Sequence, residues 1–240
     1  MAEGYQLKAP DSLQPKSLKG YHYMTHSTED KPSIPRTLDP SDPALPKTHI
    51  RSFCQPEEIR GYAFDDQFGM HAQYKSLYTK RETLEDNTSQ TNANVTLALA
   101  GENIIGFGVL NHPDEGERWQ EMGSGLMMEV KAIEVCRRFR SVGIAARILE
   151  QLMQSPVVEE CIVYMVGYSW TWDLDGTGIS GLAYRKMLIR LFEPFGLQEL
   201  QTNEPNICLK PENLFMARIG QRVSMENQKK FKWLRFGVTP

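Results

Sequence analysis

A strand that runs into a helix in the middle of the chain constrains the fold more than any other feature of the sequence. Residues 128–135 are rich in apolar and β-branched side chains, which is typical of a buried strand. Residues 140–149 carry apolar side chains at helical spacing. At the junction, Gly143 lets the main chain approach a ligand closely, and the first amides of a helix have no partner within it. The sequence therefore predicts an anion site at this helix N-terminus.

The junction also carries a specific residue pattern, Arg140-x-x-Gly143-x-Ala145. It resembles the loop that binds the pyrophosphate of acyl-CoA in the GCN5-related N-acetyltransferase (GNAT) superfamily. Ser141 stands where that superfamily often has a glycine, although its backbone amide is retained. An ordinary strand-turn-helix connection explains the loop alone equally well. The resemblance implies cofactor contacts, including a fork of phosphate donors from the arginine, at Arg140, Ser141, Val142, Gly143, Ile144 and Ala145.

The remaining periodicity predicts a mixed α/β fold around this central strand and helix. Further strands are expected over residues 48–53, 94–100, 104–111, 160–168, 197–202 and 214–219. Helices are expected from Pro56, over 71–85, over 179–192, and from a Ser224 cap to Phe236. This order describes a mixed sheet with helices on both faces.

The first 47 residues differ from the rest of the chain. They contain seven prolines and few periodic apolar positions, a composition that cannot build a core of its own. We therefore expect a Pro-rich N-terminal extension over residues 1–47 and one domain over residues 48–240. The sequence leaves the oligomeric state open.

The charge balance and hydropathy exclude several classes of partner. A net charge of −3 without a long Lys/Arg run argues against nucleic-acid binding. No apolar run is long enough to cross a bilayer, and the N-terminal residues lack the pattern of a secretion signal. We expect a cytoplasmic protein that binds neither nucleic acid nor membrane.

The cysteines and histidines are not spaced like metal ligands, so we expect no metal. The run that starts at Asp173 begins like a calcium loop, but its twelfth position is Tyr184 where a glutamate is needed. All four cysteines are expected to be buried small side chains: Cys54, Cys136, Cys161 and Cys208.

Seven short sequence blocks point to a narrower family than the superfamily resemblance of the loop. They lie at residues 117–119, 132–135, 170–174, 184–186, 203–205, 216–220 and 234–236. Together they resemble the acetoin-utilization acetyltransferases of bacilli, in a match that runs from about residue 48 to residue 236. The resemblance implies the GNAT fold, a mostly antiparallel mixed sheet that splays at its central strands. It also implies acetyl-CoA as cosubstrate and a protein lysine acetyltransferase that modifies, and thereby switches off, acetyl-CoA synthetase.

Two carboxylates on the central strand are the catalytic candidates. A lysine amine has an unperturbed pKa of about 10.4, so it must lose a proton before it attacks a thioester. We favour Glu129 as the base, because the resemblance places it where related histone acetyltransferases have their catalytic glutamate. A carboxylate inside an apolar strand is also costly unless it is used or paired, which favours a functional role for it. Glu134 either orients the base or the acceptor, or pairs with a nearby arginine. A spacing of five places the two on opposite faces of a regular strand, and only a bulge brings both to one site.

Other groups around the central strand have expected roles in the reaction. The amides of Ile133 and Val135 should pair with the pantetheine arm as another strand would, and hold the thioester oxygen. Phe192 occupies the place where many members of the superfamily have a proton-donating tyrosine. Tyr184 is two helical turns earlier, where either that role or packing explains it.

Several aromatic positions leave two interpretations open. Trp170 and Trp172 frame either the acyl-CoA tunnel or a protein-substrate groove, although core packing explains one of them equally well. Arg118 and Trp119 lie either at the acceptor entrance or in the core.

Two alternatives to protein acetylation also remain open. The chain could acetylate a small amine such as a polyamine, which a closed acidic pocket would favour. It could also be a non-catalytic module that senses CoA and interacts through its Pro-rich arm.

Overall fold

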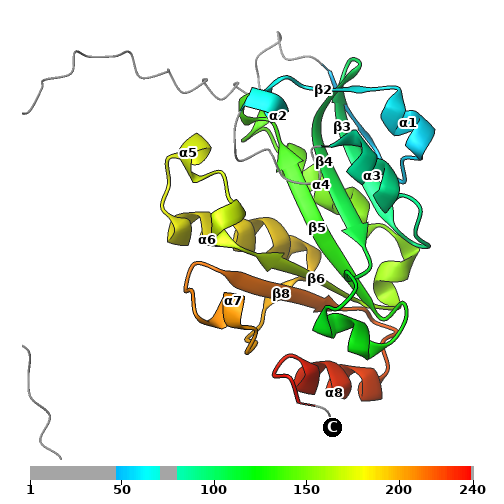
Figure 1. Cartoon of the computed structure of the whole chain (residues 1–240), viewed down its shortest axis with the longest axis vertical. Coiled ribbons are helices and arrows are strands. Elements are labelled where there is room, and N and C mark those ends of the chain that lie inside the picture. The colour runs from blue at the N-terminus through cyan, green and yellow to red at the C-terminus, as the bar shows by residue number, and fades with distance from the viewer. Residues whose placement is uncertain (1–46, 71–79, 239–240) are drawn as a thin grey trace, which may run out of the picture. The chain divides into compact units, whose positions relative to one another are not determined.

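The computed structural model describes residues 47–70 and 80–238. Residues 1–46 of the predicted extension over residues 1–47, and most of the predicted helix over 71–85, lie outside the described residues. The described strands form one sheet in the order β1-β3-β4-β5-β6-β8-β7, with β2 paired to β4 (Figure 1). Their bounds are β1 Thr48–Arg51, β2 Ala63–Phe64, β3 Asn94–Ala100, β4 Asn103–Asn111, β5 Met127–Val135, β6 Ile162–Gly167, β7 Gln198–Glu199 and β8 Leu214–Ile219.

Helices cover both faces of this sheet, and Figure 1 shows α3 and α4 on opposite sides of β3 and β4. The α-helices are α1 Pro56–Arg60, α2 Gln67–Met70, α3 Arg81–Asn87, α4 Ile144–Met153, α5 Leu174–Thr177, α6 Gly181–Phe192, α7 Pro205–Cys208 and α8 Met225–Leu234. Short 3-10 turns lie at η3 Arg118–Met122, η4 Arg137–Phe139, η5 Pro156–Glu159, η6 Ser169–Thr171 and η7 Glu193–Phe195.

The sheet is mixed, mostly antiparallel and splayed at its centre, as expected. β5 and β6 pair in parallel only where residues 127–129 face residues 162–164. In the part of the chain that the structure describes, the ladder between β5 and β6 ends at Glu129, whereas β5 stays paired with β4 up to Val135. The two central strands therefore separate halfway along β5, and they open a wedge in the middle of the fold.

Two glycines in β4 fix helix α4 against this wedge. A Cβ at Gly108 would lie 2.4 Å from Cγ2 of Ile148 in α4, and one at Gly106 would lie 3.3 Å from Cδ1 of the same residue. Only glycine permits this close approach of helix and sheet. The N-terminus of α4 is thereby held beside the C-terminal end of β5.

Several predicted elements change in length. The predicted strand over 48–53 ends at Arg51, because Phe53 takes a left-handed φ of 55°. The predicted strand over 197–202 shrinks to the two residues of β7, and the short helices α5 and α7 were not expected. The Ser224 cap is confirmed, since its hydroxyl accepts a hydrogen bond from the Asn227 amide.

The structure contradicts the predicted burial of Cys208 and decides between the two interpretations of Trp119. Cys54, Cys136 and Cys161 are buried, but Cys208 ends the short helix α7 and is exposed. Trp119 of η3 packs in a core cluster that includes Phe231 and Leu234 of α8, and its ring stacks on Phe215 at 4.7 Å between centroids. Core packing, not the acceptor entrance, therefore explains this tryptophan.

Candidate active site

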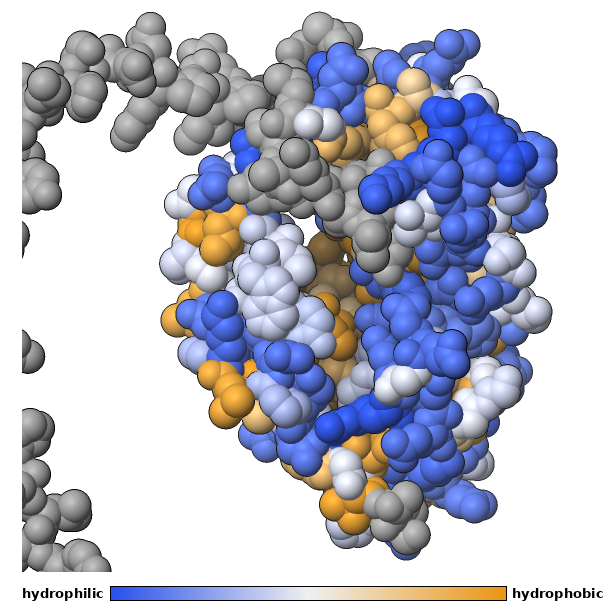
Figure 2. All heavy atoms as spheres, viewed as in Figure 1, coloured by the Kyte–Doolittle hydropathy of each residue, from blue (hydrophilic) through white to orange (hydrophobic). Residues whose placement is uncertain are grey.

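A cavity of about 800 Å³ lies where β5 and β6 diverge. It is lined by residues 129–135 of β5, by the loop and first turn of α4, by the end of β6 and by α6. On the face seen in Figure 2 the surface is hollowed between these elements, and the floor of the hollow is apolar. Its size lies within the range of roughly 300–1,000 Å³ that is usual for small-molecule sites.

A β-bulge brings the two candidate carboxylates to the same face of β5. The register with β4 shifts between Val109 and Leu110, which leaves Lys131 as the extra residue. Because of this extra residue, the alternation of side chains between the two faces of β5 shifts by one between Glu129 and Glu134. Both glutamates line the cavity. The condition that the sequence set for a common site is therefore met.

Glu129 lies at the inner end of the wedge among other charged groups. Burial raises its pKa to about 7, the Lys131 ammonium opposes that rise, and the Glu117 carboxylate adds to it. The Lys131 Nζ is 3.4 Å from Glu129 Oε2 and 2.6 Å from Asp114 Oδ1. The Tyr164 hydroxyl donates to Glu117 Oε2 at 2.9 Å. A carboxylate that titrates near neutral pH can accept a proton from an incoming amine.

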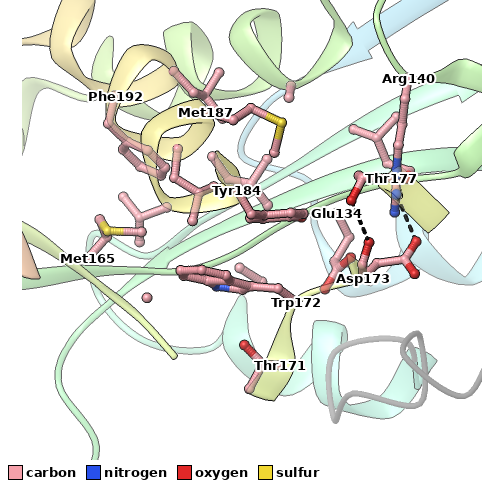
Figure 3. Close-up of a pocket in the computed structure, with 18 of the residues that line it drawn as sticks. Glu134, Arg140, Met165, Thr171, Trp172, Asp173, Thr177, Tyr184, Met187 and Phe192 are labelled. Carbon is pink, nitrogen blue, oxygen red and sulfur yellow. Dashed lines mark hydrogen bonds and ion pairs between the residues drawn. The ribbon is translucent and has the colours of Figure 1, made fainter. Parts of the chain in front are cut away.

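Glu134 lies at the outer end, beside a network of ion pairs (Figure 3). Burial raises its pKa to about 7; Arg140 opposes this rise, and Asp173 reinforces it. Arg140 donates from Nε to the Val135 carbonyl at 3.0 Å and from Nη1 to Asp173 Oδ2 at 2.7 Å. Arg137 also pairs with Asp173, at 2.6 Å. Arg140 lines the cavity, and its guanidinium is engaged by the Val135 carbonyl and the Asp173 carboxylate.

Asp173 was missed as a site residue, because the sequence presented it as the start of an incomplete calcium loop. Its carboxylate is buried, and it caps α5 by accepting a hydrogen bond from the Gly176 amide. The two arginine partners hold its pKa near 2 against the opposing effect of burial. Asp173 thus ties the loop before α4 to the connection between β6 and α6, across the mouth of the wedge.

The loop between β5 and α4 has the local geometry of an anion site. Ser141 takes a left-handed φ of 66°, at the position where the superfamily often has glycine, and Gly143 takes a φ of 81° at the helix N-cap. Among residues 47–70 and 80–238, apart from the two chain neighbours of Gly143 and the backbone of its own helix, no atom lies within 4 Å of a Cβ built at Gly143. The loop residues Arg140, Ser141 and Gly143 line the cavity with Ile144 and Ala145, whereas Val142 packs against the core.

The main chain of β5 faces the cavity beyond the bulge. The Cys136 amide donates to Ile105 of β4 at 2.9 Å, so its neighbour Val135 directs its amide to the other edge. By the same alternation, the Ile133 amide also points toward the cavity. Both groups are therefore placed for the strand-like pairing expected with a pantetheine arm.

The aromatic residues after β6 divide between the wall and the mouth of the cavity. Trp172 is buried and stacks on Tyr184 at 5.0 Å between centroids (Figure 3). Burial raises the Tyr184 pKa to about 12, so it stays protonated at neutral pH and able to donate. Trp170 is 57% exposed and stacks on Tyr168 at 4.7 Å. One tryptophan thus shapes the cavity and the other lies at its rim.

Arg118 lies elsewhere, because its guanidinium donates to Asn203 and to the Arg235 carbonyl and does not line the cavity. Within residues 47–70 and 80–238, no helix is long and apolar enough to span a membrane. In the same part of the chain, no three His, Cys, Asp or Glu side chains gather as metal ligands would.

Comparison with known proteins decides the family. The chain is 32% identical over 187 residues to the acetoin utilization protein AcuA of Bacillus licheniformis and, equally, to that of Bacillus subtilis. In both cases the match covers 78% of this chain and 88% of the relative. The chain belongs to the AcuA family of acetoin utilization proteins. No protein-family model matches the chain.

A solved structure supports the same assignment. An acetoin utilization protein from Exiguobacterium sibiricum superposes with a TM-score of 0.71 at 28% identity, over 80% of this chain and 95% of that one. The splayed β5–β6 pair and the loop into α4 complete the GNAT fold that the sequence resemblance implied.

Three observations show that the cavity fits acyl-CoA. The main chain of β5 beyond the bulge directs amides toward the cavity, the N-terminus of α4 lines it at Gly143, and the volume suits a large ligand. Apolar side chains from β6 and α6 line the interior between these polar ends: Met165, Met187, Leu188, Leu191 and Phe192.

Proposed function

We propose that this protein transfers the acetyl group of acetyl-CoA to a lysine side chain of another protein, with Glu129 as the base. The observation that carries the proposal is the inner end of the cavity, where a buried carboxylate already lies 3.4 Å from a lysine ammonium. This geometry supports a lysine amine as the acceptor, because the same contact removes the proton that blocks attack.

The proposed reaction is a direct transfer without an acyl-enzyme. The N-terminus of α4 and its loop, residues Arg140 to Ala145, hold the diphosphate, while the amides of Ile133 and Val135 hold the pantetheine arm and polarise the thioester carbonyl. Glu129 accepts the proton of the acceptor lysine, and the freed amine attacks the carbonyl carbon. Tyr184 lines the cavity as a protonated phenol and supplies a proton to the departing thiolate.

The rim of the cavity supports a protein acceptor over a small amine. Trp170 presents more than half of its surface to solvent beside Tyr168, and the Lys210 ammonium lies 5.5 Å from the centre of the Trp170 ring. An exposed stacked aromatic pair of this kind suits contacts with a protein surface, and it already accommodates a cation over one ring.

The resemblance to the acetoin-utilization acetyltransferases points to acetyl-CoA synthetase as the protein acceptor. The test is to incubate that synthetase with the protein and acetyl-CoA, and then to map acetyl-lysine by mass spectrometry and assay the synthetase. We expect one acetylated lysine and a loss of synthetase activity in step with it. The matched Glu129→Gln protein should bind acetyl-CoA and leave the synthetase unmodified.

Other outcomes would decide against this proposal in distinct ways. Rapid acetylation of polyamines with an unmodified synthetase would establish a small-amine enzyme. Tight CoA binding without transfer to any amine would establish a CoA-sensing module.

A further inference from the structure

Lys131 is a lysine that the fold places inside the acceptor end of its own cavity. It is the extra residue of the β5 bulge, and its side chain is only 3% exposed. Its ammonium contacts Glu129 at 3.4 Å and Asp114 at 2.6 Å. The first of these is the contact that an acceptor lysine has to make with the proposed base.

The position of Lys131 along β5 also places it where an acceptor lysine has to lie. Two residues before it lies Glu129, and two residues after it Ile133 directs its amide into the cavity. The thioester carbon has to lie between the base and the amide that polarises its oxygen. Lys131 belongs to the stretch of strand that spans this gap, and it lines the cavity.

We propose that Lys131 is an internal acetyl acceptor, so that with acetyl-CoA bound and no substrate lysine in the cavity the protein acetylates its own Lys131. This inference rests on the proposed function, because it uses the same donor and the same base. It assigns a modification site to a residue that neither the loop nor the family resemblance singles out.

The step balances in atoms and charge. Glu129 accepts one proton from the Lys131 ammonium, and the amine forms a C–N bond to the thioester carbonyl carbon. The C–S bond breaks, the departing thiolate takes the phenolic proton of Tyr184, and the second nitrogen proton restores that phenol. The products are Nε-acetyl-Lys131, CoA with a free thiol, and one proton on Glu129 that passes to solvent, toward which Asp114 is largely exposed.

Acetylation of Lys131 would lower the activity of the enzyme. The groups that act on Glu129 are the Lys131 ammonium, which lowers its pKa, and the carboxylates of Glu117 and Asp114, which raise it; the Tyr164 hydroxyl is bonded to Glu117. An acetylated Lys131 is neutral, so the opposing carboxylates remain without their cation. The base then titrates at higher pH, and transfer at neutral pH slows when acetyl-CoA exceeds acceptor.

The test uses the full chain with isotopically labelled acetyl-CoA and no other protein, followed by peptide mass spectrometry over time. Purified protein is first analysed for acetylation carried over from the expression host. We expect label on Lys131 at a rate per molecule that does not depend on protein concentration, because the reaction is intramolecular. Lys131→Arg and Glu129→Gln should each remove this label.

Exposed lysines provide the control for non-enzymatic acetylation. Acetyl phosphate should label the exposed Lys229 of α8 before the buried Lys131, and acetyl-CoA should reverse that order. A Lys229→Arg variant should keep full label on Lys131. Pre-acetylated protein should then transfer acetyl groups to substrate at least about tenfold more slowly at pH 7, with its activity profile moved to higher pH.

The failures of the two proposals are distinguishable. If the wild type acetylates a protein lysine while Lys131 stays unlabelled, the internal acceptor is refuted and the proposed function stands. If neither is labelled although acetyl-CoA binds, both are refuted.

Discussion

Glu129 and Glu134 lie on one face of one strand, and burial raises the pKa of each to about 7, but their counter-ions differ. Glu129 faces the Lys131 ammonium, which lies 3.4 Å from its Oε2. Glu134 faces the Arg140–Asp173 pair, in which an aspartate, two arginines and a main-chain carbonyl hold one another. The comparison teaches that two carboxylates with similarly raised pKa values can lie in different ionic surroundings, and this difference is the reason we propose different roles for them.

The largest expected effect comes from removing each carboxylate in turn. Glu129→Gln should lower kcat by about 10²- to 10⁴-fold, the usual contribution of a general base, with little change in KM for acetyl-CoA. Glu134→Gln should lower kcat by less than about tenfold, because its carboxylate faces the arginine and not the acceptor. Steady-state kinetics on a lysine peptide measures both, and the opposite ranking would reverse the assignment of the base.

The pH profile sharpens the same contrast. A base must be ionised to act, so kcat/KM should rise with pH up to about 7 and level off above it, following the raised pKa of Glu129. Glu134 has a similar pKa, so the wild-type profile alone does not distinguish the two. The acid limb should persist in Glu134→Gln and vanish in the residual activity of Glu129→Gln.

The Arg140–Asp173 ion pair at the outer end of the cavity should affect acetyl-CoA binding more than the chemical step. Asp173→Asn keeps the shape of the side chain but removes the charge that holds Arg140, so the loop before α4 is less fixed. We expect KM for acetyl-CoA to rise about tenfold, a cost of about 1.4 kcal/mol, with kcat nearly unchanged. The exposed Asp86→Asn in α3 is a matched control. An equal loss in kcat would place Asp173 in the chemical step.

The smallest effect concerns the backbone of the loop. Ser141→Gly relieves a left-handed conformation that costs roughly 1–2 kcal/mol for a residue with a side chain, offset by about 0.5–1 kcal/mol of added freedom in the unfolded chain. We expect the free energy of unfolding to increase by about 0.5 kcal/mol, measured by urea titration. Ser124→Gly, in an exposed turn without a positive φ, should instead destabilise. If Ser141→Gly and Ser124→Gly both lower the free energy of unfolding, the Ser141 hydroxyl contributes more to stability than relief of its left-handed φ.

Local patterns predicted much of the fold because they depend on neighbours in sequence. The strands over residues 94–100 and 214–219 and the Ser224 cap were predicted correctly, since alternation and capping are short-range signals. Predictions failed where distant contacts decide. Cys208 is exposed because α7 is a single turn at the surface, and the two-residue β7 depends on its pairing with β8.

By itself, the sequence determined the central strand, the loop into α4, the two candidate carboxylates and, through the seven blocks, the family. Only the tertiary structure decided that both carboxylates share a face, since that depends on the bulge in register with β4. It alone also placed Lys131 beside Glu129 and Asp173 across the wedge from the loop. The physical reason is that proton affinity follows from burial and from charges that meet through the fold, and Asp173 lies 33 residues from its partner Arg140.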